Sequence, residues 1–231
     1  MFSRISKFFT FAWHMVGVNR RLLFGMWKMT RLPQPAVTFF GGSRITPDSS
    51  EGKKATMLAQ ELAQCGFSII TGGGPGIMEA ANRGALTNCS VEKNCDTNFS
   101  SFAIGLTRLN NEKINPHVQD YIMMEYFFER KWLLVRYAVA FVVFPGGFGT
   151  IDELSEILTL IQCDRMPNTP VILIGTEYWN PMKKWMTECM LKNDLLLKED
   201  LDIFVITDDI QEACKLIETK CQNHDAPSFS G

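Results

Sequence analysis

The chain of 231 residues lacks the patterns that mark metal-binding and disulfide-bonded proteins. Its seven cysteines include no C-x-x-C pair, and its three histidines stand far apart, at positions 14, 117 and 224. Neither a disulfide framework nor a zinc site is expected from such spacing. Reduced thiols that act as small apolar side chains fit the odd cysteine count better, so we expect a cytoplasmic protein without a bound metal.

Long apolar runs are also missing. The run at residues 8–18 is shorter than the roughly 20 residues that a membrane-spanning helix needs, and no cleavage site of small residues marks it as a secretion signal. The composition is otherwise ordinary, with 46% apolar and 21% charged residues, which excludes disordered and coiled-coil chains. A single globular domain of α/β size is the expectation for this length.

Acidic residues are absent from the first 43 positions, which carry six basic residues. The remaining positions hold 17 basic and 25 acidic residues, so the net charge of −2 combines +6 in the N-terminal segment with −8 in the rest. Phe8, Phe9, Phe11 and Trp13 accompany the basic residues, and residues 1–33 are expected to pack on a partner subunit or to lie on an anionic membrane surface. Packing is favoured over the membrane, since so many aromatic side chains exceed what a free arm would expose. Nucleic-acid binding is not expected, because no recognised binding module is present.

After Pro33 and Pro35 the chain alternates short apolar runs with stretches of helical period. Three parts are expected: a basic, aromatic-rich helical extension at residues 1–34, one domain at 35–220 and a flexible tail at 221–231. Strands are predicted at residues 37–40, 67–71, 102–106, 140–144, 171–174 and 203–207, and helices at 49–64, 76–86, 127–137, 150–162, 181–191 and 208–219. Apolar strands that alternate with helices predict an α/β fold with a single doubly wound, Rossmann-like parallel sheet flanked by helices. Residues 88–100 are polar and predict a surface loop.

Nine of the 17 glycines lie in three clusters, at residues 41–42, 72–76 and 146–149, each directly after a predicted strand. The carboxyl ends of parallel strands share one edge of the sheet, where ligands bind. A glycine-rich turn before a helix brings backbone amides close to a phosphate. One such turn can be merely a tight turn, but three at one edge favour a phosphate-bearing ligand. The G-x-G-x-x-G and G-x-x-x-x-G-K-[ST] patterns are both absent, so a nicotinamide dinucleotide and a Walker-type triphosphatase are not expected.

Two readings of Glu153 stay open. Thr150 and Glu153 have the spacing of a capping box at the start of a helix. Alternatively, the rise of about 6 Å over four helical residues places Glu153 one sugar ring away from a phosphate held at residues 147–150. A carboxylate there could stabilise a developing ribose cation or position a water molecule.

The basic pair Arg130 and Lys131 is equally open to interpretation. Adjacent basic residues usually lie on a solvated surface. Arg130 becomes relevant to a phosphate or a departing base only if it faces the glycine-rich edge. Glu79 and Arg83, four residues apart, indicate an ion pair on one helix more than a site.

These motifs together resemble the LOG ("Lonely Guy") phosphoribohydrolases, a family long labelled lysine decarboxylase-like. The resemblance runs from about residue 37 to about residue 217 and is carried by FFGGSR at 39–44, TGGGPGIMEAANRG at 71–84, RK at 130–131 and PGGFGTIDE at 145–153. The specific part is the P-G-G-x-G-T-x-x-E element together with the upstream Arg-Lys pair.

The resemblance implies a homodimer or higher homo-oligomer, without a cofactor, that cleaves a purine nucleoside monophosphate. AMP or an N6-modified AMP would give the free base, a cytokinin in some members, and ribose 5-phosphate. Arg130 and Glu153 would be the catalytic pair, and the nucleotide or its phosphate would contact Gly42, Ser43, Gly73, Gly74, Lys131, Gly146, Gly147, Gly149 and Thr150. Lysine decarboxylation is not expected, because it needs pyridoxal phosphate on a dedicated lysine.

A carrier or sensor that binds a nucleotide or a phosphorylated cofactor without cleaving it is the alternative. Relatives of this fold bind such ligands, molybdenum cofactor among them. The complete pair of Arg130 and Glu153 favours the enzyme.

Overall fold

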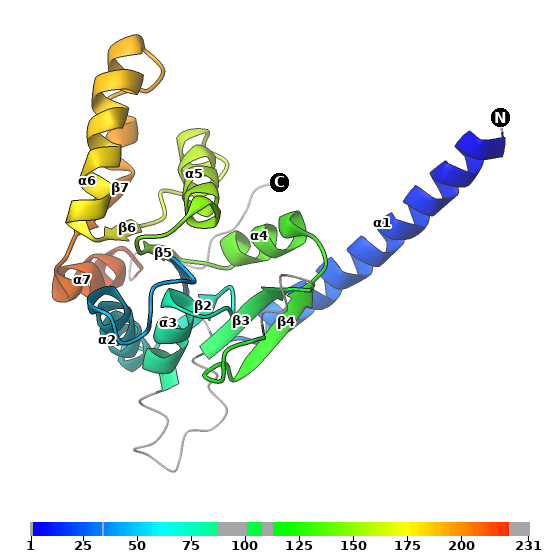
Figure 1. Ribbon diagram of the computed structural model, residues 1–231, viewed down its shortest axis with the longest axis horizontal. Helices are drawn as coiled ribbons and strands as arrows, with labels where there is room; N and C mark the ends of the chain where they lie inside the picture. Colours follow the sequence, from blue (N-terminus) through cyan, green and yellow to red (C-terminus); the bar gives the residue numbers. More distant parts are fainter. Residues whose placement is uncertain (1, 34, 87–100, 108–112, 222–231) are drawn as a thin grey trace.

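A computed structural model describes residues 2–33, 35–86, 101–107 and 113–221 of the chain. Seven parallel strands form one sheet in the order β4-β3-β2-β1-β5-β6-β7 (Figure 1). Their bounds are β1 Ala36–Phe40, β2 Ser68–Thr71, β3 Ser101–Leu106, β4 Asp120–Met124, β5 Ala140–Val143, β6 Val171–Ile174 and β7 Phe204–Thr207. The predicted α/β class with a parallel, Rossmann-like sheet is confirmed.

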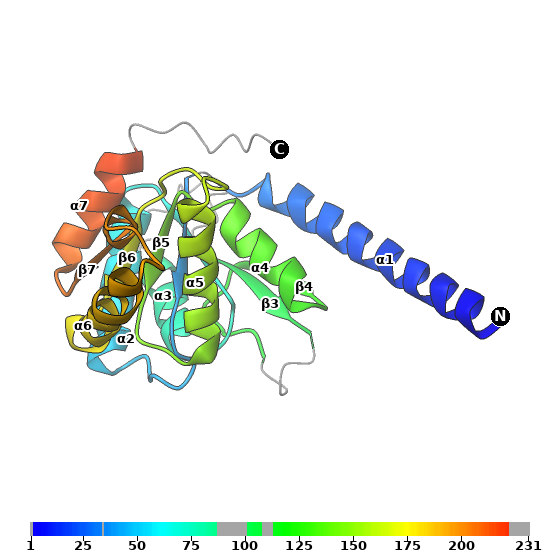
Figure 2. The same cartoon turned by 90° about the horizontal axis from the view of Figure 1, so that it is seen from above.

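Helices cover both faces of this sheet (Figures 1 and 2). They are α1 Phe2–Met29, α2 Ser50–Gln64, α3 Ile77–Leu86, α4 Phe127–Arg136, α5 Phe148–Gln162, α6 Thr176–Trp185 and α7 Ile210–Cys221, with short π or 3-10 turns at Met186–Met190, Leu191–Asn193 and Glu199–Asp202. One buried cluster joins the sheet to α1, α4, α5 and α6, and a second joins it to α2, α3 and α7. The strand order reverses between β1 and β5, which creates a crevice at their carboxyl ends.

The structure corrects three expectations about elements. Strand β4 at Asp120–Met124 was not predicted; it begins with a charged residue and Tyr121 is half-exposed, unlike the fully buried inner strands. Helix α6 begins at Thr176, ahead of the predicted start at Pro181, because Asp208 accepts a hydrogen bond from the Thr176 amide at 3.0 Å. Helix α5 begins two residues early, at Phe148. The predicted loop at residues 88–100 and the tail beyond Cys221 lie outside the described residues.

Helix α1 extends away from the rest of the molecule (Figure 2). Its C-terminal part packs on the sheet, where Val18 and Met29 are buried. Its N-terminal part carries Phe8, Phe9 and Trp13, each more than 60% exposed (67%, 67% and 78%). Among the described residues, no helix combines the length and the apolar character needed to cross a membrane.

Candidate active site

A cavity of about 580 Å³ opens at the crevice between β1 and β5. Loops after β1, β2 and β5 form its walls, as the three glycine clusters predict, and α4 and α6 add side chains. Its lining comprises residues 39–45, Gly72, Met78, Phe127, Arg130, residues 145–150, Glu153 and Tyr178. Gly42, Ser43, Gly146, Gly147, Gly149, Thr150, Arg130 and Glu153 are therefore brought together.

Gly73 and Gly74 line a smaller hollow of about 50 Å³ beside this cavity. The two spaces share Gly72, Met78 and Arg130 in their walls. The glycine loop after β2 thus lies between the two spaces. Gly73 and Gly74, which were predicted to contact the nucleotide, line the smaller hollow and not the main cavity.

Arg130 and Glu153 form an ion pair at the wall of the cavity. Arg130 Nη1 donates to Glu153 Oε1 at 3.0 Å, and Arg130 Nε donates to the Ile104 carbonyl oxygen at 3.0 Å. The two side chains are only 14% and 12% exposed. A Cβ atom at Gly72 would lie 2.0 Å from Arg130 Nη2, so only glycine lets the guanidinium reach this position. Arg130 therefore faces the glycine-rich edge of the sheet, which is the condition that the sequence analysis set for a role in ligand binding.

Burial raises the pKa of the Glu153 carboxyl group above its usual value, while the adjacent Arg130 charge and hydrogen bond oppose this shift. Carboxyl groups that balance burial against a cation at the wall of a cavity are common in catalytic sites. The pair can therefore present a carboxylate whose basicity is higher than that of an exposed glutamate.

The capping-box reading of Glu153 is wrong. Helix α5 begins at Phe148, its N-cap is Gly147, and no side chain caps it. Thr150 lies inside the first turn, with its hydroxyl group against Gly146, where an added Cβ atom would come within 2.1 Å. Glu153 is thus free of a capping role, and its hydrogen bond goes to Arg130.

The loop at residues 145–149 leads into α5, and its backbone lines the cavity. An added Cβ atom at Gly147 or Gly149 would meet no atom within 4 Å. The loop is held from behind, because the Gly42 amide donates to the Pro145 carbonyl at 2.9 Å and the Tyr178 hydroxyl donates to the Gly146 carbonyl at 2.5 Å. A fixed turn at a helix N-terminus offers unpaired amides to an anion.

Lys131 was expected to contact the nucleotide, and its side chain points away from the cavity that Arg130 and Glu153 line. Its Nζ atom pairs with Asp152 Oδ2 at 3.0 Å and with Glu156 Oε2 at 2.6 Å. It lines a separate groove on the outer side of α4 and α5. Successive residues of a helix point about 100° apart, which places Arg130 and Lys131 on different sides.

Sequence reasoning missed Glu129, which is fully buried. Its carboxylate accepts hydrogen bonds from the Glu125 and Tyr126 amides, both at 3.0 Å, and from Arg21 Nε at 3.0 Å. Arg21 also pairs with Glu125 at 2.9 Å. Helix α1 is thereby attached to the first turn of α4, next to Arg130. The only signal in the sequence was a glutamate at the third position of a predicted helix, where capping glutamates stand.

A buried amide network supports the glycine loop after β2. Asn82 is fully buried and accepts from the Thr71 hydroxyl at 2.7 Å and from Asn115 Nδ2 at 3.0 Å. Asn115 Nδ2 also donates to the Gly73 and Gly74 carbonyls at 3.2 and 3.1 Å. The network fixes this wall of the cavity through α3.

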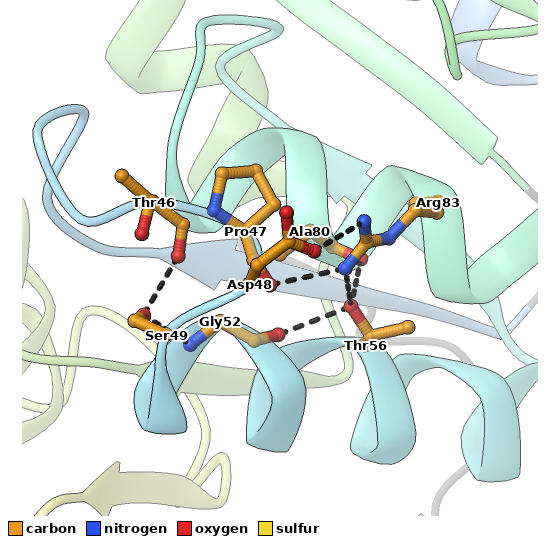
Figure 3. A network of polar contacts seen from close by, with 8 residues as sticks. All are labelled: Thr46, Pro47, Asp48, Ser49, Gly52, Thr56, Ala80 and Arg83. Atoms are coloured by element: carbon orange, nitrogen blue, oxygen red, sulfur yellow. Dashed lines mark hydrogen bonds and ion pairs between the residues drawn. The ribbon is translucent and has the colours of Figure 1, made fainter.

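Arg83 lies on α3 away from the cavity. It pairs with Asp48 at 3.2 Å and donates to the Pro47 carbonyl at 3.0 Å (Figure 3). These contacts tie α3 to the loop before α2, and within α2 Thr56 links the two helices by donating to the Ala80 carbonyl at 3.0 Å. Arg83 therefore has a structural role, but its carboxylate partner is Asp48, whereas the sequence analysis had paired it with Glu79.

Residues 78–217 match the model of a protein family described as "Possible lysine decarboxylase". The chain belongs to this family. A pyrimidine/purine nucleotide 5'-monophosphate nucleosidase of Escherichia coli K12 is 29% identical over 166 residues, which are 68% of this chain and 35% of that protein. A rice (Oryza sativa subsp. japonica) protein named "Probable cytokinin riboside 5'-monophosphate phosphoribohydrolase" is 28% identical over 148 residues, 63% of this chain and 62% of the relative.

The chain therefore spans only part of these relatives: 35% of the length of the first and 62% of the length of the second. Among solved structures, the molybdenum cofactor carrier protein of Chlamydomonas reinhardtii superposes with a TM-score of 0.57 at 20% identity. It covers 82% of this chain and 99% of that one. The likeness establishes the fold. The predicted membership of the LOG family is confirmed, and relatives named for nucleotide hydrolysis belong to it.

Proposed function

We propose that the protein is a phosphoribohydrolase that cleaves the N-glycosidic bond of AMP or an N6-modified AMP. The observation that carries this proposal is the buried pair of Arg130 and Glu153, set beside a glycine turn that opens α5. Hydrolysis of this bond needs a phosphate anchor and a carboxylate close to the ribose, and little else. The names of the relatives agree with the same reaction class.

In the proposed complex, the 5'-phosphate binds the amides of Gly147 and Gly149 and the hydroxyl group of Thr150. The turn and the positive end of the α5 dipole favour the dianion, although the rest of the chain beyond residue 43 carries a net charge of −8. The phosphate is remote from the reacting bond, so its binding energy can hold the anomeric carbon beside Glu153.

The bond between ribose and base then breaks with its electron pair leaving on the base nitrogen, which takes up a proton from solvent, and Glu153 later returns to solvent the proton that it accepts from the attacking water. The Glu153 carboxylate stabilises the positive charge that develops on the ribose, and it accepts the proton of the water that adds to the anomeric carbon. Arg130 holds the carboxylate in place and opposes the effect of burial on its pKa. The products are the free base and ribose 5-phosphate, which balances one nucleotide and one water.

The test is a panel of nucleoside monophosphates incubated with the protein, with release of free base measured by chromatography. AMP or its N6-modified form should release base fastest. Glu153→Gln should bind the nucleotide without releasing base, while Glu156→Gln, one turn further along α5 and outside the cavity, should retain the rate of the unmodified protein. Tight binding of AMP without base release by the unmodified protein would overturn the enzyme and favour the alternative of a carrier or sensor, which its molybdenum cofactor carrier neighbours exemplify.

We also propose that the protein forms a homodimer through α1. Phe9, Trp13, Val16, Leu23 and Trp27 are each at least half exposed and follow the spacing of one helical stripe. The segment that carries this stripe has a charge of +6 and no acidic residue, whereas the rest of the chain has a net charge of −8. The acidic part of a second copy therefore attracts the basic segment of the first.

Light scattering during gel filtration tests this assembly. The unmodified protein should have twice the mass of one chain. The double variant Phe9→Glu with Trp13→Glu should have the mass of one chain, and the matched variant Thr10→Glu on the polar side of α1 should stay dimeric. A monomer in all three cases would contradict the proposal, and binding of the unmodified protein to anionic vesicles would then favour the membrane reading.

A further inference from the structure

A second hollow, of about 860 Å³, lies between α2 and α7, outside the candidate active site. Both helices cover the same face of the sheet and lie side by side (Figure 1). The hollow is lined by four carboxylates, two thiols and one cation, with two amides: Glu61, Asp209, Glu212, Glu218, Cys65, Cys214, Lys215, Gln64 and Gln211. This excess of negative and sulfur-bearing groups has no part in the proposed hydrolysis.

Three potential ligand atoms converge in this hollow. The sulfur atoms of Cys65 and Cys214 and a carboxylate oxygen of Glu218 all lie within 4.8 Å of one another. Among the residues that the structure describes, this is the one such group of three. Cys65 ends α2, and the other two residues lie one turn apart on α7, so the set joins two helices.

One of the three spacings, between Cys214 and Glu218, equals the ligand separation at tetrahedral zinc, and all three lie within 4.8 Å. Zinc lies about 2.3 Å from a thiolate sulfur and about 2.1 Å from a carboxylate oxygen, and a tetrahedral angle then separates the two ligand atoms by about 3.6 Å. The distance from Cys214 Sγ to Glu218 Oε1 is 3.6 Å. Two thiolates with one carboxylate are a donor set that suits zinc over magnesium or calcium, which prefer oxygen alone.

The charge of the hollow favours a cation. Its lining holds four carboxylate side chains against the single cation of Lys215. A divalent ion would be attracted by this excess of negative charge, and it would bind the two thiols as thiolates.

We propose that Cys65, Cys214 and Glu218 bind one zinc ion, with a water molecule as the fourth ligand, and that the ion ties the end of α2 to α7. Binding converts two thiols to thiolates, and their two protons go to solvent. The sequence analysis expected no metal, because these ligands follow no local motif: 149 positions separate the two cysteines, and only the packing of α2 on α7 brings them together.

The first test measures zinc by elemental mass spectrometry in the full-length protein, after incubation with zinc and gel filtration under a thiol-free reductant. The informative variant is Cys65→Ser, because Cys65 is exposed and its loss does not disturb the core. Cys163→Ser is the matched control, since Cys163 is exposed and likewise ends a helix, α5. We expect one zinc per chain in the unmodified protein and in Cys163→Ser, and at least a tenfold loss in Cys65→Ser.

Cobalt provides a second readout, because a thiolate-bound cobalt ion gives a near-ultraviolet charge-transfer band. The band should form with the unmodified protein and with Cys163→Ser, and it should be lost in Cys65→Ser and weakened in Glu218→Gln. Equal zinc content in Cys65→Ser, or no zinc in the unmodified protein, would overturn the proposal.

Discussion

Two successive residues of α4 differ completely in their surroundings. Arg130 turns inward and pairs with Glu153 at the cavity wall, where both side chains are nearly buried. Lys131 turns outward and pairs with Asp152 and Glu156, and Asp152 is 60% exposed. The inner pair and the outer pair join the same two helices, α4 and α5, within one helical turn.

The difference between these pairs is electrostatic as well as spatial. Burial raises the pKa of Glu153 against the effect of Arg130, so its charge is held at a cost in stability. Burial lowers the pKa of Lys131, but hydrogen bonds to Glu156 and Asp152 outweigh it and raise the pKa overall, so its charge is stabilised. The inner pair is suited to chemistry, and the outer pair is suited to holding α4 on α5.

The largest effect should come from exchanging the basic residues one at a time. Arg130→Lys removes the guanidinium that contacts both Glu153 and the Ile104 carbonyl, and it should lower kcat/KM for AMP by about 100-fold or more, as loss of a positioned donor does. Lys131→Arg keeps the outer charge and should change kcat/KM by less than about twofold. Steady-state kinetics of both variants checks this, and similar losses in the two would break the contrast.

The attachment of α1 to α4 should show the next effect. Arg21→Gln leaves the fully buried Glu129 without its cation and should lower the free energy of unfolding by about 2 kcal/mol, since Arg21 is itself partly exposed. Arg83→Gln removes a partner of Asp48, which is 86% exposed, and should cost less than about 1 kcal/mol. Urea denaturation of the two variants distinguishes buried from exposed pairs. An equal loss of unfolding free energy in the two variants would mean that burial does not determine how much an ion pair contributes to stability.

The turn that opens α5 should respond to added methyl groups at only one of two neighbouring glycines. A Cβ atom at Gly146 would clash with Thr150, so Gly146→Ala should destabilise the protein by about 1–3 kcal/mol. Gly147→Ala meets open space and should leave stability unchanged. If the phosphate binds at this turn, Gly147→Ala should still raise KM for AMP. An unchanged KM in Gly147→Ala would show that the phosphate does not bind at this turn.

The smallest effect should be a pH dependence confined to the inner pair. The pKa of Glu153 is raised in the folded protein, so its protonated form is favoured there. The stability that Glu153 contributes is fully present below its unfolded pKa of about 4.3 and is lost as pH rises through the folded value. The unfolding free energy of the unmodified protein, minus that of Glu153→Gln, should therefore fall as the pH is raised above the unfolded value. If this difference instead rose with pH, the pKa of Glu153 would be lowered in the folded protein and not raised.

The sequence predicted the scaffold of this contrast well. Strand-length apolar runs and glycine turns placed the three loops correctly at one edge of the sheet, because these signals are local. The family motif likewise gave Arg130 and Glu153 as a pair, and the structure brings them within hydrogen-bond distance.

The remainder depended on how helices rotate and pack. Lys131 was expected at the nucleotide, but the orientation of α4 on the sheet turns it outward. Thr150 and Glu153 had capping spacing, but α5 begins two residues earlier, so neither acts as a cap. Glu129 is bound by Arg21 from a helix 108 residues away in the chain, a contact that no local pattern encodes.

The central claim is that the inner carboxylate, Glu153, breaks the N-glycosidic bond. The most direct measurement is base release from saturating AMP by the unmodified protein, Glu153→Gln and Glu156→Gln, with AMP binding measured calorimetrically on the same samples. We predict base release by the unmodified protein and by Glu156→Gln. Glu153→Gln should lose at least about 100-fold in rate while still binding AMP. Turnover by Glu153→Gln at the rate of Glu156→Gln would contradict the account.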